Sequence, residues 1–327
     1  MGSRNVRVLA ATALTIAGVA FAGSLQGQTT ADEPVPQPER ASSLQLSAAV
    51  ANELQSDVER HDYIAAEKIL LAEIDRDSHS VRTALLLAYI GTVYFANQDY
   101  LNAAVAWKKS EEIAPLNPKI RFSLAMAYVR LARPDWARAV IESLAKQNDK
   151  EARYPYWLGR LDYDAHFYNS SIAHFQRAIE IDPKMARAYD NLGLCYYYEN
   201  QNDLAIANFE KAIELERGSV HPSPWPYLNL GIAQQFLNQL PESEGSLREA
   251  LRIDPEFAKA HFQLGTVLED RNKPEEAVAE LKQAARLDTT YPEPHMALAR
   301  IYHKIGQEPA AREEVKIYLQ LRPHSNP

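Results

Sequence analysis

The only cysteine of the chain, Cys195, lies directly before three tyrosines in the stretch NLGLCYYYEN, which makes it the first candidate for chemistry. A nucleophilic cysteine needs a thiolate, and a neighbouring lysine, arginine or protonated histidine favours that form. No basic residue is adjacent to Cys195 in the sequence, and the carboxylate of Glu199, one helical turn further on, disfavours a thiolate. We therefore expect Cys195 to be a small, buried apolar side chain and not a nucleophile.

The histidines offer the next possible chemistry, since imidazole serves as a base and as a metal ligand. The closest pairs, His166 with His174 and His295 with His303, are eight residues apart. Eight residues span about 12 Å of helix, which is too far for two side chains to hold one ion unaided. The sequence also contains no HExxH, P-loop, GxSxG or dinucleotide-binding glycine motif. We expect a non-enzyme with no catalytic residues, no metal site and no cofactor.

Net charge and cysteine content exclude further classes. The formal charge is −8, which makes the phosphate backbone of a nucleic acid an unfavourable partner. A single cysteine excludes an intramolecular disulfide framework. We therefore expect a protein or peptide partner and no nucleic acid.

The N-terminal segment is typical of an export signal. Arg4 and Arg7 precede an uncharged run from Val8 to Ala22, and Ala20 and Ala22 flank Phe21 as at a cleavage site. We predict a signal peptide at 1–22, a periplasmic or extracellular protein, and contact with a membrane only if the signal is not cleaved. Residues 23–43 carry prolines at 34, 36 and 38, which predicts a disordered, proline-rich linker.

The rest of the chain must supply the elements that position any site, and it repeats. Leu-Gly pairs recur at 158/159, 192/193, 230/231 and 264/265, with separations of 34, 38 and 34 residues. The longer separation reflects an insertion near GSVHPSPWP, where we expect a longer loop. A fixed period of this length indicates stacked helical hairpins, because neither helix of one unit can bury its apolar face alone.

The unit resembles the tetratricopeptide repeat. In Ala186–Ser219 the positions typical of that family are filled by Tyr189, Leu192, Gly193, Tyr196, Ala205, Phe209 and Ala212. Seven units tile 84–325, beginning at 84, 118, 152, 186, 224, 258 and 292, and a degenerate first helical repeat fits 44–83. The resemblance implies an all-α, right-handed superhelical solenoid of antiparallel helix pairs. Asn200, Asn238, Asn272 and Gly306 are expected at left-handed positions between the helices of a pair.

The resemblance also implies where a ligand binds. In this family ligands contact the inner face of the first helices, at positions 2, 5, 9, 12 and 13 of each unit, with position 6 added in some repeats. The candidate peptide-binding residues on this concave face are Phe122, Arg153, Tyr156, Arg160, Tyr163, Asp190, Asn191, Leu194, Tyr197, Tyr198, Trp225, Asn229, Phe236, Lys259 and Phe262. Aromatic and arginine side chains are typical of binding hot spots. The alternative is that these aromatics only pack against neighbouring helices.

Two details limit the choice of ligand. A two-carboxylate clamp, which in some relatives grips the end of a peptide, is matched by Asn229 and Lys259 but not by Asp190, Leu194 or Gln263. Within the tyrosine run, we expect Tyr196 to pack inside its own hairpin, while Tyr197 and Tyr198 turn to the concave side.

These observations predict a non-catalytic interaction scaffold or adaptor in the cell envelope. It would bind a protein segment in its concave groove. The alternative is a structural, self-assembling repeat protein that uses the ends of the solenoid, where Ile317 and Leu321 belong to the last helix.

Overall fold

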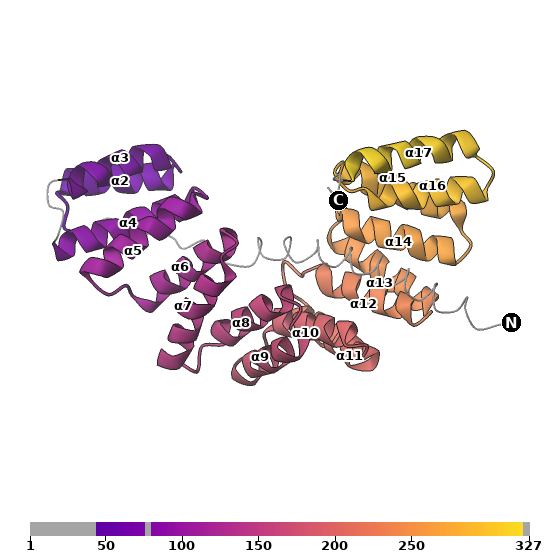
Figure 1. Ribbon diagram of the computed structural model, residues 1–327, viewed down its shortest axis with the longest axis horizontal. Coiled ribbons are helices and arrows are strands. Elements are labelled where there is room, and N and C mark those ends of the chain that lie inside the picture. Colours follow the sequence, from indigo (N-terminus) through magenta and orange to yellow (C-terminus); the bar gives the residue numbers. More distant parts are fainter. Residues whose placement is uncertain (1–43, 76–79, 323–327) are drawn as a thin grey trace. The chain divides into compact units, whose positions relative to one another are not determined.

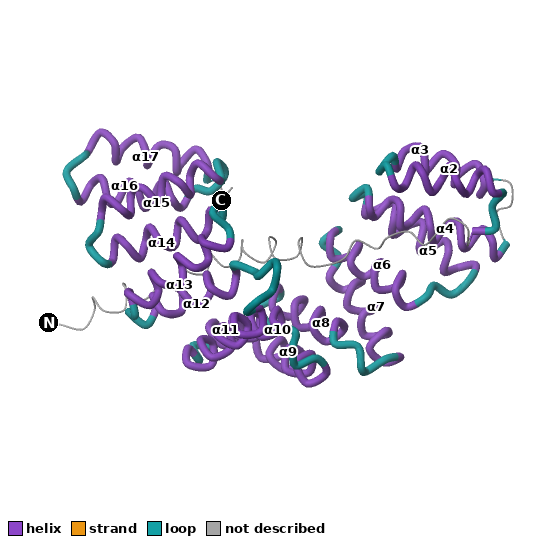
Figure 2. The backbone as a smooth tube through the Cα atoms, turned by 180° about the vertical axis from the view of Figure 1, so that it is seen from behind, coloured by secondary structure: helices purple, strands orange, loops and turns teal. Residues whose placement is uncertain are grey.

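The structure is a computed structural model that describes residues 44–75 and 80–322. The predicted signal peptide at 1–22 and linker at 23–43 lie outside the described residues. Within the described ranges the regular structure is helical and contains no strand (Figure 2). The helices are α2 (Ala48–Glu59), α3 (Tyr63–Ile74), α4 (Val81–Ala96), α5 (Tyr100–Ile113), α6 (Pro118–Arg130), α7 (Pro134–Gln147), α8 (Arg153–Asp164), α9 (Tyr168–Ile181), α10 (Ala186–Tyr198), α11 (Asn202–Glu216), α12 (Trp225–Phe236), α13 (Leu240–Ile253), α14 (Ala258–Asp270), α15 (Pro274–Leu287), α16 (Glu293–Lys304) and α17 (Glu308–Leu321).

The chain divides into two compact units, and the division falls inside α8, between Leu161 and Asp162. The described part of the N-terminal unit comprises α2 to α7 and most of α8. The described part of the C-terminal unit comprises the end of α8 and α9 to α17.

Consecutive helices pack as hairpins, and successive hairpins pack on one another. In the N-terminal unit α2 pairs with α3, α4 with α5 and α6 with α7, while in the C-terminal unit α10 to α17 form four further pairs (Figure 1). The second helix of a pair also contacts the first helix of the next, as α11 does α12 and α13 does α14. This arrangement confirms the predicted all-α solenoid of helix pairs.

Local sequence explains where the helices begin and end. Several N-terminal helices start at an acceptor side chain, as at Asp99, whose carboxylate accepts from the backbone N–H of Asn102 at 3.1 Å. Many later helices instead carry proline in the first turn, where no N–H is needed. The predicted left-handed turn residues are confirmed, with φ of 59° at Asn200, 60° at Asn238, 59° at Asn272 and 79° at Gly306.

The core of each hairpin depends on small residues where the two helices approach. Ala205 and Ala277, at the twentieth position of their units, are fully buried. Ser243 takes the same position, and its hydroxyl donates to the carbonyl of Gly231 at 2.6 Å, so that its polarity is satisfied. The predicted longer loop is also present, since α11 ends at Glu216 and α12 begins only at Trp225. Among the described helices, none combines the length and apolarity that a bilayer crossing requires.

Candidate functional site

The first helices of the last four hairpins, α10, α12, α14 and α16, contact one another in order within the C-terminal unit. Side chains that link these four helices form a continuous set, which we call the inner row. It consists of Asp190, Tyr197, Trp225, Asn229, Gln235, Phe236, Lys259, Gln263, Thr266, Glu269, Asp270 and Arg300.

The junction between α10 and α12 has one polar and one aromatic contact. The Asn229 amide donates to Asp190 Oδ1 at 2.8 Å, and both side chains are buried. Near the other end of the helices, the Tyr197 and Phe236 rings meet edge to face, with centroids 5.8 Å apart. Burial raises the pKa of Tyr197 to about 12, so its hydroxyl stays protonated at neutral pH. Phe236 is 47% exposed and presents a ring to solvent.

Between α12 and α14 the contacts are polar. The Gln235 amide donates to Asp270 Oδ2 at 2.6 Å and to Thr266 Oγ1 at 3.5 Å, and its carbonyl oxygen accepts from Gln263. One glutamine therefore ties three side chains of the next repeat to α12.

The start of the same two helices holds a cation against an aromatic ring. Lys259 Nζ lies 5.2 Å from the centroid of the Trp225 ring, and Phe257 meets that ring edge to face at 4.8 Å. No described carboxylate lies within ion-pair distance of this ammonium group. Burial lowers the pKa of Lys259 to about 8, although Asp288 and Glu293 exert an opposing electrostatic effect from further away.

Between α14 and α16 an ion pair continues the row. Arg300 Nε donates to Glu269 Oε1 at 2.8 Å, and a second guanidinium nitrogen lies 2.5 Å from Glu269 Oε2. Two turns earlier on α14, the buried Phe262 ring meets Tyr291 edge to face at 5.3 Å. Met296, at the fifth position of its unit, is 38% exposed.

A tyrosine cluster lies at the start of the C-terminal unit. The rings of Tyr168 and Tyr198 stack with centroids 4.9 Å apart, and Tyr163 meets both edge to face at 5.6 Å and 5.8 Å. Tyr163 is buried, and burial is the main reason that its pKa lies well above the ordinary value. Tyr198 is half-buried.

The prediction for Cys195 is confirmed by the structure, whereas the prediction for its neighbour Tyr196 is not. Cys195 is fully buried, and its thiol donates to Ser171 Oγ at 3.2 Å, which confirms the prediction of a small core side chain. The prediction for Tyr196 is wrong. Its half-exposed hydroxyl accepts from Gln176 Nε2 at 3.1 Å, on α9 of the preceding hairpin, while Tyr197 is the buried member of the pair. The hydroxyl reaches a neighbouring helix because the eleventh position of the unit lies at the contact between hairpins.

Two contacts involve the predicted residues of the N-terminal unit. The Arg153 guanidinium lies 5.1 Å from the centroid of the Phe122 ring. Arg160 Nη1 donates to the Tyr156 hydroxyl at 3.4 Å, and both side chains are buried. Arginine side chains therefore contact aromatic side chains of α6 and α8.

The remaining predicted residues, Asn191 and Leu194, belong to α10, and both are buried. Leu194 is fully buried, and the Asn191 amide donates to the Arg187 carbonyl of its own helix at 2.7 Å. The predicted set omits Arg300 and Met296. The repeat period contains the signal for both, because Arg300 follows Thr266 by 34 residues and Met296 follows Phe262 by 34 residues.

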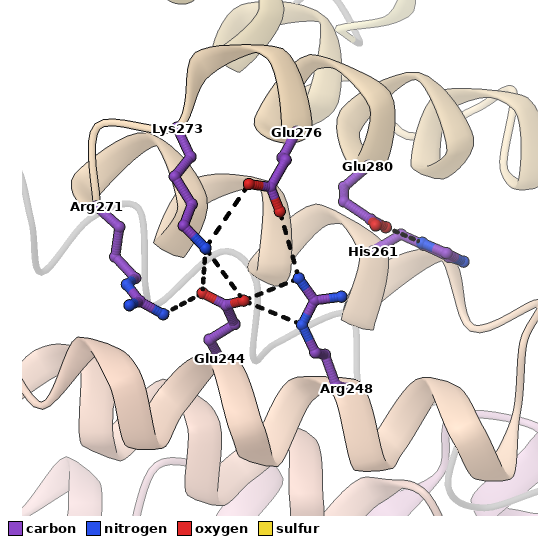
Figure 3. A network of polar contacts seen from close by, with 7 residues as sticks. All are labelled: Glu244, Arg248, His261, Arg271, Lys273, Glu276 and Glu280. Atoms are coloured by element: carbon purple, nitrogen blue, oxygen red, sulfur yellow. Dashed lines mark hydrogen bonds and ion pairs between the residues drawn. The ribbon is translucent and has the colours of Figure 1, made fainter.

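A charged network links α13 to α14 and α15 (Figure 3). Glu244, whose side chain is 11% exposed, accepts from Arg248 at 2.8 Å and 3.0 Å, from Lys273 at 3.3 Å and 3.5 Å, and from Arg271. Burial opposes the charged form of Glu244, but the hydrogen bonds from Arg248 and Lys273 outweigh it and lower the pKa of the carboxyl. Within the described residues no cluster of three or more histidine, cysteine or carboxylate side chains has the geometry to hold a metal ion.

The geometry defines the class of protein: a solenoid of antiparallel helical hairpins whose first helices present linked side chains. The family profiles described as "Tetratricopeptide repeat" and "TPR repeat" match residues 184–256 and 268–306. These two segments, both in the C-terminal unit, therefore contain tetratricopeptide repeats. It is 30% identical over 125 residues to the tetratricopeptide repeat domain-containing protein PYG7, chloroplastic, of Arabidopsis thaliana, covering 37% of this chain and 40% of that protein. It is 32% identical over 114 residues to the Protein STIP1 homolog of Dictyostelium discoideum, covering 34% of this chain and 18% of that protein.

Solved structures share the fold at low sequence identity. A tetratricopeptide repeat protein from Parabacteroides merdae superposes with a TM-score of 0.63 and 15% identity, covering 83% of this chain and 98% of that one. The Cut9-Hcn1 hetero-tetramer structure of the APC/C matches with a TM-score of 0.60 and 17% identity, over 79% of this chain and 49% of that one. PilW, titled a type IV pilus biogenesis factor, matches with a TM-score of 0.56 and 22% identity, over 60% of this chain and 90% of that one. These similarities show the fold, a solenoid of antiparallel helix pairs.

Proposed function

We propose that this protein is an exported, non-catalytic scaffold that binds a protein segment along the inner row of its C-terminal unit. An acidic group of that segment would lie against Lys259. The tetratricopeptide-repeat fold supports protein binding in general. The partner's chemistry and the binding surface are inferred from the side chains of the inner row.

The ammonium group of Lys259 is the observation that carries the proposal. It is largely desolvated, it lies over Trp225, and it has no ion-pair partner among the described carboxylates. Burying a cation without a counter-ion costs free energy, and an incoming carboxylate would recover that cost. Lys259 therefore favours a glutamate, an aspartate or a terminal carboxylate in the ligand.

Apolar side chains on α12 and α16 add exposed surface to the inner row. Phe236 lies on α12 and is 47% exposed, and Trp225, at the start of the same helix, is half-buried. Met296 on α16 is 38% exposed. Aromatic rings at the centre of an interface contribute most of the affinity in many complexes. An extended segment or an amphipathic helix that combines apolar residues with one acid suits this surface.

A peptide-binding experiment tests this proposal. Fluorescein-labelled 12-residue peptides that combine aromatic and aliphatic residues with one glutamate are titrated with the full chain, and each is compared with its glutamine counterpart. The glutamate peptides should bind more tightly, and Lys259→Gln should weaken them about tenfold, which corresponds to about 1.4 kcal/mol. Lys282→Gln is the matched control, because Lys282 also lies over a ring, that of Tyr302 at 5.9 Å, but on the second helix of its hairpin. If Lys259→Gln binds every peptide as the wild type does, the assigned surface is wrong.

Export is tested separately. The full chain is expressed in a bacterial host, the cells are fractionated, and the mature N-terminus is sequenced. The composition of the first 22 residues predicts a periplasmic product that begins near Gly23. An intact Met1 on a protein that stays in the cytoplasm would refute export without affecting the peptide-binding result.

Self-assembly through the last helix is the second candidate function. Val315 on α17 occupies the position that the fully buried Leu281 holds on α15, yet it is 37% exposed, and Leu319 is 58% exposed. A second copy could cover these side chains. Light scattering at increasing concentration should then show a dimer that Leu319→Glu abolishes, and a strict monomer would exclude this role.

A further inference from the structure

The imidazole of His261 joins three segments of the C-terminal unit. Its Nδ1 lies 2.6 Å from Glu280 Oε2 on α15, and its Nε2 lies 3.0 Å from the carbonyl oxygen of Pro255, in the turn between α13 and α14. The ring belongs to α14, and its side chain is only 13% exposed. One side chain therefore connects the first helix of this hairpin to its second helix and to the preceding turn.

The two partners of the ring determine its protonation state. A carboxylate oxygen and a backbone carbonyl oxygen only accept hydrogen bonds, so both ring nitrogens must donate to satisfy this arrangement. A neutral imidazole carries one N–H, and it would turn a lone pair toward one of the two oxygens. The imidazolium ion is thus the form that satisfies both contacts at once.

We propose that His261 and Glu280 form a pH-dependent latch that holds the α14–α15 hairpin closed when the imidazole is charged and loosens it when the proton is lost. This inference does not depend on the proposed ligand. It concerns the stability of a hairpin, whether or not a peptide binds to the inner row.

The charges around His261 agree with such a latch. Glu280 faces it from α15 and Asp254 from the end of α13, and both carboxylates favour the cation. Burial opposes the charged form, but the hydrogen bonds to Glu280 and to the Pro255 carbonyl outweigh burial and raise the pKa of His261. No described cation takes part in these contacts.

The same contact recurs one repeat later. His295 Nδ1 lies 2.7 Å from Glu314 Oε2, and both residues follow His261 and Glu280 by 34 positions. The equivalent positions of the three preceding units hold Pro155 with His174, Tyr189 with Asn208, and Tyr227 with Ser246. The histidine–glutamate contact is thus confined to the last two of the described hairpins.

The position of Glu280 ties the latch to the rest of the interface. Glu276, one turn earlier on α15, lies 3.5 Å from Arg248 and 3.7 Å from Lys273, both members of the Glu244 network (Figure 3). Two successive turns of α15 thus contact α13 and α14 through charged side chains. Because each repeat of a solenoid is stabilised by its neighbours, loosening α15 would also weaken the support of α16 and α17.

The direction of the pH effect follows from linkage. A histidine with a raised folded-state pKa contributes stability that is fully present below its unfolded pKa of about 6.5 and is lost as the pH rises through the folded value. The latch is therefore closed near pH 6 and weakens toward pH 8 and above.

Two measurements on the full chain test the latch. With ¹³C-labelled histidine, the His261 resonance is assigned by its absence in His261→Gln and is titrated by NMR. Its pKa should lie above about 6.5 and should fall in Glu280→Gln, which keeps the side-chain shape but removes the charge. Hydrogen exchange then compares α14–α15 with α12–α13 at pH 6 and pH 8.5. Relative protection of α14–α15 should fall about tenfold for each unit by which the pKa of His261 in the folded state exceeds its unfolded-state value.

His303→Gln is the matched control, because His303 contacts Glu308 at 2.6 Å but is 74% exposed. It should leave the pH dependence of α14–α15 unchanged. In His261→Gln the fall in protection should disappear, and only the opposite effect of Lys259, whose desolvation cost decreases above about pH 8, should remain. The latch is refuted if His261 titrates at or below its ordinary value, if Glu280→Gln leaves that value unchanged, or if His261→Gln retains the wild-type pH dependence. If His261→Gln fails to fold, the His261 resonance is assigned instead by its shift in Glu280→Gln, and the comparison of those two titrations still tests the latch.

Discussion

Gly193 and Phe209 lie in direct contact across the α10–α11 hairpin: a Cβ placed on Gly193 would come within 2.6 Å of Phe209 Cε1. The same relationship, sixteen residues apart, joins Gly91 to Trp107, Gly231 to Leu247 and Gly265 to Leu281, with closest approaches of 2.5 Å, 2.7 Å and 2.6 Å. Each of these large side chains is fully buried. The absent Cβ is therefore what sets the distance between the two helices of a hairpin.

Gly193→Ala should destabilise the protein. The added methyl group must displace the Phe209 ring or separate α10 from α11, and overpacking of this kind costs about 1–3 kcal/mol. That cost exceeds the gain of up to about 1 kcal/mol from replacing a helical glycine by alanine. Chemical denaturation followed by circular dichroism measures the change in the free energy of unfolding.

The control for Gly193→Ala is Gly245→Ala on α13. A Cβ at Gly245 would meet nothing within 4 Å, so only the helix-propensity gain remains. This variant should be more stable than the wild type by about 0.5–1 kcal/mol. Equal effects of the two substitutions would show that contact with Phe209 does not set the hairpin spacing.

The glycine positions also show what the sequence predicts well. Leu-Gly pairs at a period near 34 residues indicate helical hairpins, because only a small residue allows such a close crossing. The asparagines at 200, 238 and 272 identify the turns, since their left-handed backbone conformation favours asparagine and glycine. The fold could be predicted because these requirements are local and recur in every unit.

The candidate site could be predicted less completely. The period indicates that Trp225 and Lys259 lie on one face of the first helices, but it cannot show that the Lys259 ammonium lies over the Trp225 ring. The sequence showed only that Asp190 does not match a two-carboxylate clamp, whereas the structure gives it a hydrogen bond from Asn229. Side-chain pairs between repeats depend on rotamers and on the neighbouring helix, which a single-unit pattern does not contain.

Glu244→Gln should destabilise the C-terminal unit by about 1–3 kcal/mol. The substitution removes the charge that compensates Arg248, Arg271 and Lys273, and leaves these cations close together. We place the effect below that of a fully buried ion pair, because Arg248 is half exposed. Thermal unfolding of the variant and of Glu249→Gln gives the comparison. Glu249 contacts Arg252 at 2.8 Å with both side chains well exposed, so its loss should change stability by less than about 0.5 kcal/mol.

The same substitution should alter the acid limb of the stability profile. The pKa of Glu244 is lowered, so its contribution is present above the unfolded-state value and is lost as the pH falls through the folded-state value. Wild-type stability should therefore decline more steeply below about pH 4.5 than that of Glu244→Gln. Urea denaturation at a series of pH values measures the two slopes, and parallel profiles would contradict the assignment.

Asn229→Ala should cost about 1.5–3 kcal/mol, because it removes a buried hydrogen bond to a carboxylate that links α12 to α10. Asn208→Ala provides the comparison, since the Asn208 amide donates only to the Leu204 carbonyl of its own helix, at an exposed site. That variant should be within about 0.5 kcal/mol of the wild type. Denaturant midpoints of the two variants decide the point, and equal losses would mean that the link between α10 and α12 contributes nothing specific.

Lys259→Met should raise stability while weakening the binding of acidic peptides. Burial lowers the pKa of Lys259 to about 8, so the charged form destabilises the folded state at pH 7, and the desolvation cost is lost when methionine replaces it. After discounting for partial exposure, we expect a gain of about 0.5–1.5 kcal/mol in the free energy of unfolding. This gain in stability should shrink as the pH rises above about 8, because wild-type Lys259 then loses its charge in the folded state and with it the desolvation cost. Peptide affinity of the wild type should fall over the same pH range.

Lys282→Met, the control on α15, should change neither the stability nor the peptide affinity. A Lys259→Met protein that is less stable and binds acidic peptides normally would mean that Lys259 supports the fold and not the ligand.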